Sequence, residues 1–298
     1  MSVNDLRDPT PPKSGRLFGL PPPLMSACSA LQLVPLGDIR PHEDHSARRA
    51  GRLADTIALD GKQRHPVILG RSSRAPLLHL DGINRIAALR SLGCAHVAAQ
   101  IVDYHDERAV ALDTWSHITR LNASELLANR SALWNVKPFT GTEANFALAR
   151  SALIAAVVFD AGGTLGVTCP GSIFDKMECL AWLSSSYRAE PVRVATCGFV
   201  EVSEAETLLK DYPQANALVL FGGLAKQQII DVALDGRKLV PPGITRHIIT
   251  CGRVLNIDVP LSLLQSKAAI AKKMTTMSEV LGRRTPRVYR EPTIHLED

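Results

Sequence analysis

The sequence has no hydrophobic run long enough for a membrane-spanning helix, which needs about 20 mostly apolar residues. The apolar stretch over residues 152–158 is too short for that role and is better explained as a buried strand or helix. The N-terminus also lacks the basic region and apolar core of a signal peptide. We therefore expect a protein without a membrane partner.

The sequence also lacks paired cysteine motifs. Its six cysteines stand apart, with no C-x-x-C spacing, at Cys28, Cys94, Cys169, Cys179, Cys197 and Cys251. This pattern indicates neither a disulfide framework nor a zinc site. Unpaired cysteines are typical of a reducing compartment, so we expect a cytoplasmic location.

Aromatic residues are scarce, at 5%, but 46% of the 298 residues are hydrophobic, which is ordinary for one or two globular domains. The net charge of +5 is mildly basic, and much of the excess lies near the C-terminus, in Lys272, Lys273, Arg283, Arg284, Arg287 and Arg290. Such a cluster favours nucleic acid or an anionic substrate, or it is a solvated basic tail. Composition does not decide between these readings.

The first 30 residues contain six prolines and little apolar periodicity, which predicts a flexible tail. After it, residues 31–39 are expected to be extended. Ser46 is a plausible N-cap for a helix over about 47–60, and Gly61 ends that helix. Strands over 66–70 and 76–80 are expected to form a hairpin.

A second helix is expected over residues 83–92, followed by a strand over 96–104. Beyond this region the pattern is less regular. The sequence predicts a helix containing Trp115, His117 and Ile118. Further helices are expected at 123–129, 142–155 and 263–277, and short strands at 157–159 and 218–221. Residues 225–234 are expected to form a helix, although their isoleucine and valine content also permits a strand.

The junction between the hairpin and the second helix reads Asp81-Gly82-Ile83-Asn84-Arg85. A glycine turn that opens a helix offers unpaired N–H donors, and an arginine one turn later adds a clamp for phosphate. Asp81 adds a carboxylate that could hold Mg²⁺, or the amine or hydroxyl of a substrate. The alternative, without a binding role, is a helix cap with a surface arginine.

An acidic and histidine-rich cluster, HEDH at 42–45, precedes the first helix. Glu43 is a candidate general base, and the alternative is a solvated loop carboxylate. The flanking histidines raise the question of a metal, but no third or fourth ligand stands at a recognised spacing.

One further motif, VVFDAGGTL at 157–165, resembles the nucleophile loop of haloacid dehalogenases. That chemistry usually needs a second acid two residues after the first, where Gly162 stands. A strand followed by a glycine turn is therefore the better interpretation.

Three segments carry a family resemblance: HEDH at 42–45, LDGINRIAALRSLG at 80–93 and PPGITRHIITCGRVLNIDVPLSLL at 241–264. Residues 31–118 resemble the ParB/sulfiredoxin superfamily. Within it the chain is most similar to the free L-serine kinases, which include an archaeal ADP-dependent enzyme and a ParB-like enzyme of siderophore biosynthesis. The resemblance implies an α/β (α+β) fold with a ParB/sulfiredoxin-like N-terminal core over 31–120. A C-terminal α/β extension over 121–298 would complete the pocket.

The resemblance also implies roles for individual residues. Glu43 would be the general base, and Asp81 would act at the substrate end of the site. The nucleotide phosphates would lie against Gly82, Ile83, Asn84 and Arg85, and serine would contact Trp115, Thr245, Arg246 and His247. One departure is Asn84, where the family often has histidine. Asparagine can donate a hydrogen bond but cannot become cationic.

The implied function is transfer of a phosphoryl group from ATP or ADP, with Mg²⁺, to the hydroxyl of L-serine. The product, O-phospho-L-serine, would feed cysteine synthesis, or 2,3-diaminopropionate synthesis for a siderophore. The alternative is a ParB-like nucleotide-dependent DNA-binding or regulatory protein, although no clear helix-turn-helix follows residue 120 and we expect DNA not to be the partner. The sequence leaves the oligomeric state open, a homodimer included.

Overall fold

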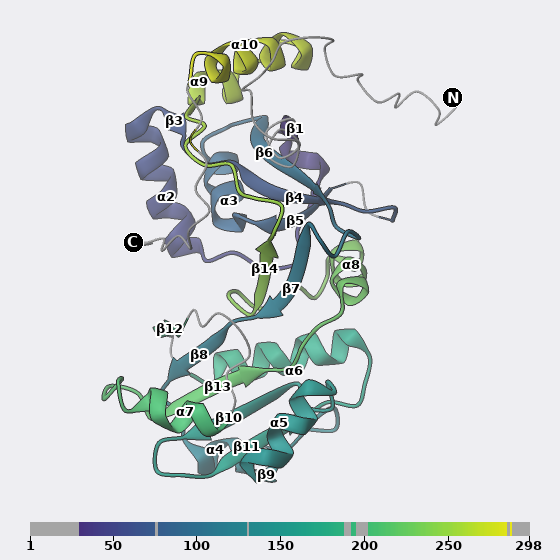
Figure 1. Cartoon of the computed structure of the whole chain (residues 1–298), viewed down its shortest axis with the longest axis vertical. Helices are drawn as coiled ribbons and strands as arrows, with labels where there is room; N and C mark the ends of the chain where they lie inside the picture. The colour runs from purple at the N-terminus through teal and green to yellow at the C-terminus, as the bar shows by residue number, and fades with distance from the viewer. Residues whose placement is uncertain are drawn as a thin grey trace.

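The computed structural model describes residues 30–74, 77–129, 131–187, 192–194, 202–284 and 287. Two separate sheets, each covered by helices, make up the upper and lower parts of the molecule in Figure 1. The expected proline-rich tail lies almost entirely outside the described residues.

The first sheet has five strands in the order β1-β6-β4-β5-β2. Their bounds are β1 Leu31–Pro35, β2 Ile39–Arg40, β4 Val67–Arg71, β5 Leu77–Asp81 and β6 His96–Asp103. A short 3-10 turn, Leu36–Asp38, joins β1 to β2. Strands β4 and β5 form the predicted antiparallel hairpin, and β4 runs parallel to β6. The sheet therefore places the end of β5, and with it Asp81, at the start of the next helix.

Two helices flank this sheet, α2 (Ala47–Asp60) and α3 (Ile83–Ser91). The Ser46 side chain accepts a hydrogen bond from the Arg49 backbone N–H, and Gly61 ends α2 in the left-handed conformation at φ 65°. Both helix ends match the sequence prediction, because caps of this kind depend on local residues alone.

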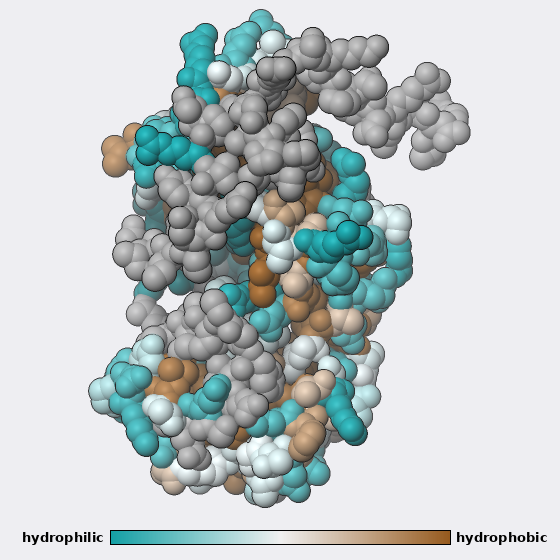
Figure 2. Space-filling view, viewed as in Figure 1, coloured by the Kyte–Doolittle hydropathy of each residue, from teal (hydrophilic) through white to brown (hydrophobic). Residues whose placement is uncertain are grey.

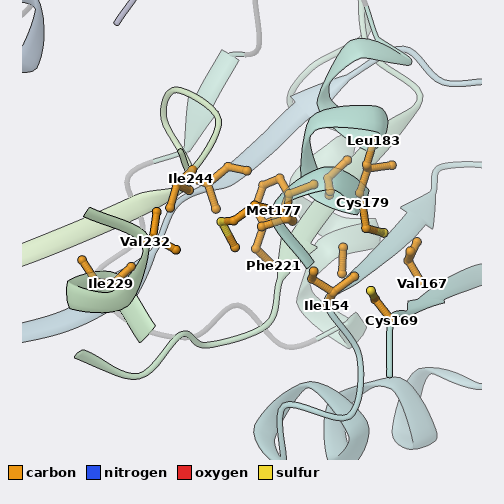
Figure 3. Packing of buried hydrophobic residues seen from close by; sticks show 14 of the residues in the cluster. Ile154, Val167, Cys169, Met177, Cys179, Leu183, Phe221, Ile229, Val232 and Ile244 are labelled. Atoms are coloured by element: carbon orange, nitrogen blue, oxygen red, sulfur yellow. The ribbon is translucent and has the colours of Figure 1, made fainter. Parts of the chain in front are cut away.

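The second sheet is antiparallel throughout, in the order β12-β8-β13-β10-β11-β9. Its strands are β8 Ser116–Thr119, β9 Asn135–Phe139, β10 Ala155–Phe159, β11 Thr164–Thr168, β12 Val192–Val194 and β13 Ala217–Phe221. The associated helices are α4 Ala123–Ala128, α5 Gly141–Ala149, α6 Ile173–Ser185, α7 Val202–Leu209 and α8 Lys226–Asp235. In Figure 3, Met177, Cys179 and Leu183 of α6 point toward the strands of this sheet.

The motif at 157–165 forms the hairpin between β10 and β11, with Gly162 and Gly163 at φ 87° and 94°. This confirms a strand and glycine turn there. A surface hollow of about 410 Å³ lies beside this turn, lined by residues that include Asn122, Asp160 and Asn216.

A two-stranded ribbon joins the two sheets: β7 (Val110–Thr114) pairs with β14 (Thr245–Ile249) (Figure 1). The chain then returns to the first sheet, where β15 (Val259–Pro260) pairs with β3 (Lys62–Gln63). The last helices, α9 (Leu261–Gln265) and α10 (Ile270–Gly282), pack their apolar side chains into the core around β1 and β6. The C-terminal segment therefore covers the N-terminal sheet.

Three sequence predictions need correction. Trp115, His117 and Ile118 do not lie on a helix: Trp115 stands between β7 and β8, and the other two belong to β8. This segment pairs with β13 and β12, and partners so distant in the chain override a weak local helix pattern.

The helix expected over 142–155 ends at Ala149, because Ser151 adopts φ 54° and turns the chain into β10. The helix expected over 263–277 is broken into α9 and α10. There the Ser266 hydroxyl accepts a hydrogen bond from the Ala268 backbone N–H, which stabilises a turn in place of a helix.

No helix among the described residues has the length and apolar character needed to cross a membrane. On the face shown in Figure 2, hydrophobic residues are visible near the middle of the molecule, beside hydrophilic ones. Of the basic C-terminal residues, Lys273 is buried, with its Nζ 3.1 Å from His96 Nδ1. Arg284 pairs with Asp258, so these two cations contribute less to an open basic patch than the sequence indicates.

Candidate active site

The HEDH segment is held in place by the loop that precedes β14. Val240 donates a backbone hydrogen bond to the carbonyl of His42 and accepts one from the N–H of Asp44, at 2.9 and 3.0 Å. Glu43 lies between these two bonds and pairs with Val240 in an isolated parallel β-bridge. Its position in space is thus set by a segment about 200 residues away.

The Glu43 carboxylate contacts the T-R-H segment directly. The backbone N–H of Gly243 donates to Oε1 at 2.9 Å, and the hydroxyl of Thr245 donates to Oε2. The side chain of Thr245 is buried. Two donors, one from the loop before β14 and one from the first residue of β14, orient the carboxylate, as a positioned general base requires.

His42 lies behind this contact and is buried. Its Nδ1 is 2.7 Å from the carbonyl oxygen of His79, and its Nε2 is 3.0 Å from the Thr245 hydroxyl. Burial lowers the pKa of His42 to about 4, although the bond to His79 opposes this shift. His42 is therefore neutral near pH 7 unless a neighbour supplies a proton.

The expected phosphate turn has the predicted form. Gly82 is the N-cap of α3 and adopts φ 97°, a left-handed conformation that favours glycine. Its pseudo-Cβ position is 3.0 Å from both Arg85 Nη1 and Val67 Cγ1, so a larger residue would be crowded. Gly82 has no side chain that could cap the helix. The first N–H groups of a helix lack intrahelical partners and favour an anion.

Asn84 and Arg85 have structural partners in this turn. The Asn84 side-chain oxygen accepts the backbone N–H of Ser46 at 2.9 Å, which ties α3 to the start of α2 and to the HEDH segment. Arg85 donates from Nη1 to the carbonyl of Pro66 at 2.8 Å. Asn84 thus supplies an acceptor that joins two parts of the site.

Asp81, at the end of β5, forms an ion pair that was not predicted. Arg253 donates from Nη1 to Oδ2 of Asp81 at 2.6 Å. Burial raises the pKa of Asp81, but the charges of Arg253 and Arg85 outweigh it and hold the pKa below its usual value. Arg253 lies inside the segment 241–264 that carries the family resemblance, which is the one signal that could have identified it.

His247 is buried and does not lie at the surface of the site. Its Nδ1 is 3.1 Å from the Leu80 carbonyl and its Nε2 is 3.0 Å from the Tyr104 hydroxyl. Its ring packs edge-on against that of His42, which in turn stacks on His79. Burial also lowers the pKa of His247 well below its usual value.

Arg246 points to the other face of β14, as strand alternation requires. Its guanidinium lies 4.6 Å from the centre of the Trp115 ring, and the Trp115 backbone N–H is bonded to the Ile244 carbonyl. The structure therefore divides the expected substrate residues: Thr245 and His247 lie with Glu43 and His42, and Arg246 with Trp115 on the opposite face.

The described part of the chain holds no group of three or more His, Cys, Asp or Glu suited to a metal. What converges is a carboxylate, a helix start and a cation. The HEDH segment is bonded to α3 through Asn84 and to β14 through Thr245, and Asp81 is bonded to Arg253.

The protein has an α/β fold, as the sequence resemblance led us to expect. No family model matches the sequence. The chain is 27% identical over 237 residues to the ATP-dependent L-serine kinase SbnI of Staphylococcus aureus, which covers 79% of this chain and 84% of that protein.

Solved structures agree on the fold. A C-terminally truncated SbnI from Staphylococcus aureus superposes with a TM-score of 0.66 at 23% identity, covering 86% of this chain and 97% of that one. A free serine kinase in complex with AMP gives 0.61 at 18% identity, covering 79% and 93%. The α/β fold class predicted from the sequence is confirmed.

Proposed function

We propose that this chain is a free L-serine kinase that transfers a phosphoryl group from a nucleotide to the serine hydroxyl. The observation that carries the proposal is the convergence at Glu43. A carboxylate oriented by Gly243 and Thr245 is joined, through the bond between Ser46 and Asn84, to the N-terminal turn of α3. The similarity to the L-serine kinase SbnI over most of the chain supports the same reaction.

In this proposal the nucleotide phosphates bind at the first turn of α3, where Gly82 and Ile83 begin the helix and Arg85 adds positive charge. Glu43 accepts the proton of the serine hydroxyl as its oxygen attacks phosphorus. Phosphoryl transfer is governed by positioning and charge neutralisation, and the site supplies both. Asp81 and Arg253 stand at the same mouth, where one can orient a cationic group and the other an anionic one.

A single carboxylate fits a Mg²⁺ ion that arrives with the nucleotide, because Mg²⁺ usually takes one or two carboxylates together with substrate phosphates. Asp81 would be that carboxylate, with 43% of its side chain exposed. When bound, the ion would neutralise phosphate charge. The remaining steps belong to the residues of the chain.

Trp115, Thr245, Arg246 and His247 are proposed to form the serine side of the site. Arg246 on Trp115 supplies a cation suited to the serine carboxylate. Thr245 and His247 act from the other face, through their bonds to Glu43 and to Tyr104.

We further propose ATP or ADP as the donor, the cytoplasm as the location, and cysteine or 2,3-diaminopropionate synthesis as the destination of the product. The division at about residue 120 stays a prediction, in which the part over 31–120 binds phosphate and the part over 121–298 completes the pocket. A homodimer also stays open to test.

The competing function is a nucleotide-dependent DNA-binding or regulatory protein. The exposed basic residues Lys272, Arg283 and Arg287 of α10 and the following segment favour it. Such binding would weaken steeply with salt, because each phosphate contact releases counterions.

The deciding experiment incubates the protein with L-serine, Mg²⁺ and either ATP or ADP, and measures O-phosphoserine by mass spectrometry. Glu43→Gln is the matched variant, since it keeps the size of the side chain and removes the base. We expect product with one donor at least, and loss of about 10²-fold or more in the variant. No product with either donor, together with salt-dependent DNA binding, would establish the competing function.

A further inference from the structure

Glu43, Thr245 and His42 form a continuous chain of polar contacts. The Thr245 hydroxyl lies between Oε2 of Glu43 and Nε2 of His42, and the far side of the His42 ring meets the His79 carbonyl at 2.7 Å. Thr245 and His42 are both buried, with 8% and 1% of their surface exposed. Water therefore has little access to the contact between Thr245 and His42 or to that between His42 and His79.

The tautomer of His42 follows from its partner. A carbonyl oxygen only accepts hydrogen bonds, so Nδ1 of His42 must carry the proton that it donates to His79. In a neutral ring Nε2 is then an acceptor. The Thr245 hydroxyl, 3.0 Å from Nε2, is the donor within reach.

Thr245 has only one proton, but it faces two acceptors. If Glu43 is ionised and His42 is neutral, that proton can serve Oε2 or Nε2 and leaves the other contact without a hydrogen. One additional proton satisfies both contacts. It resides either on His42, which then donates to Thr245, or on Glu43, which then donates to Thr245 while Thr245 donates to His42.

We propose that Glu43, Thr245 and His42 form a proton relay in which the Thr245 hydroxyl couples the protonation of the Glu43 carboxyl group to that of the His42 ring. The relay rests on the proposed kinase function. His42 is accordingly a positioning residue of the phosphoryl transfer, and Thr245 acts through Glu43.

The step balances as follows from the state in which Glu43 carries the shared proton. The serine oxygen forms a bond to phosphorus, and the bond from phosphorus to the leaving oxygen of the nucleotide breaks, with its electron pair remaining on that oxygen. The serine proton moves to Oε1 of Glu43. The proton on Oε2 moves to the Thr245 oxygen, and the Thr245 proton moves to Nε2, so His42 ends as an imidazolium.

The surroundings of His42 return the relay to its starting state. His79 from β5 and His247 from β14 face its ring, with Thr245 and Glu43 along its polar edge. Burial disfavours the imidazolium and lowers the pKa of His42 to about 4, so at neutral pH its proton returns through the Thr245 hydroxyl to Glu43, which passes it to solvent. A buried ring of this kind holds a proton transiently and does not store it.

The kinetic test compares Thr245→Val, which removes the hydroxyl at nearly constant shape, with Thr245→Ser, which keeps it. We expect Thr245→Val to lower kcat at least about tenfold, to change the pH profile of kcat and to leave the KM for nucleotide within about twofold. Thr245→Ser should restore most of the rate and the wild-type profile. Equal rates and profiles for the two variants would overturn the relay.

Thr114→Val is the matched control. Thr114 lies directly opposite Thr245 on β7, and its hydroxyl donates to the Phe221 carbonyl at 3.2 Å, outside the relay. This variant loses a hydroxyl from the same ribbon and should keep the wild-type pH profile.

A second measurement does not depend on activity. Nitrogen NMR of the histidine rings in the full-length wild type should show His42 with its proton on Nδ1 near pH 7, and Thr245→Val should shift the Nε2 resonance. A proton on Nε2 in the neutral ring would overturn the relay even in an active kinase. The expected tautomer in a protein that makes no phosphoserine would instead overturn the kinase and leave the coupling in place.

Discussion

Arg253 donates a hydrogen bond to Asp81 across 2.6 Å, joining two residues that stand 172 positions apart in the sequence. Both side chains are partly exposed at the mouth of the site, at 41% and 43%. Asp81 directly precedes Gly82, so the pair places the Arg253 guanidinium beside the Gly82 turn. It therefore links the C-terminal segment to the proposed phosphate site.

Arg253→Gln should weaken nucleotide binding more than folding. Loss of the guanidinium removes a cation near the phosphates, and we expect the KM for nucleotide to rise about tenfold. The free energy of unfolding should change by less than about 1 kcal/mol, because exposed pairs contribute little. Steady-state kinetics and urea unfolding measure the two effects. Arg64→Gln, which breaks the exposed pair with Asp60, is the control and should leave KM unchanged.

Gly82→Ala should destabilise the protein and weaken nucleotide binding together. Alanine at φ 97° is strained by about 1–2 kcal/mol, and its methyl group would crowd Arg85 and Val67. Urea unfolding and calorimetric titration with ADP provide the two readouts. Unchanged stability would contradict the geometry described for this turn.

Gly51→Ala is the control for Gly82→Ala. Gly51 lies inside α2, and nothing is within 4 Å of the position that its Cβ would take. Alanine should therefore stabilise the protein by about 0.5–1 kcal/mol. Stability changes of opposite sign for the two substitutions would show that Gly82 is required by its backbone conformation, and that alanine does not act in the same way at every glycine.

Acid should destabilise the protein below about pH 6.5. The pKa values of buried His42 and His79 fall to about 4 and about 3, so in that range the unfolded chain binds protons that the folded chain does not. Stability is complete above the unfolded pKa of 6.5 and declines as pH falls, by about 1.4 kcal/mol per pH unit for each histidine. Unfolding midpoints in urea from pH 7 to pH 5 test this slope.

His79→Leu should reduce the dependence of the unfolding free energy on pH by about the contribution of one proton. Neither ring nitrogen of His79 has a hydrogen-bond partner among the described residues, so leucine at this position should not lower stability at pH 7. His105→Gln, at an exposed position, should leave the slope as it is. A slope unchanged in His79→Leu would show that this ring does not resist protonation.

Trp115→Ala should raise the KM for serine about tenfold, whereas Trp115→Phe should keep it within about threefold. The Trp115 ring supports the Arg246 guanidinium at 4.6 Å, and phenylalanine retains an aromatic face for that cation. Kinetics at saturating nucleotide isolate this effect. An equal KM in both variants would remove Trp115 and Arg246 from the serine side of the site.

Local signals explain which parts of the fold were predictable. Ser46 and Gly61 mark the ends of α2, and the apolar runs of β4 and β5 mark a hairpin, because caps and alternation act over a few residues. The turn at Gly82 was predictable for the same reason. The strand at Ser116–Thr119 was not, since its stability depends on partners in β12 and β13.

The sequence by itself determined the glycine turn, the candidate base Glu43 and the family resemblance, because each depends on neighbouring residues or on a motif. The tertiary structure alone decided that Thr245 meets Glu43 and His42, that Arg253 meets Asp81, and that Arg246 faces Trp115. These contacts join β14 and its flanking segments to the first sheet. Their geometry arises from how two sheets and a ribbon pack, and no local pattern in the chain encodes which distant side chains will meet.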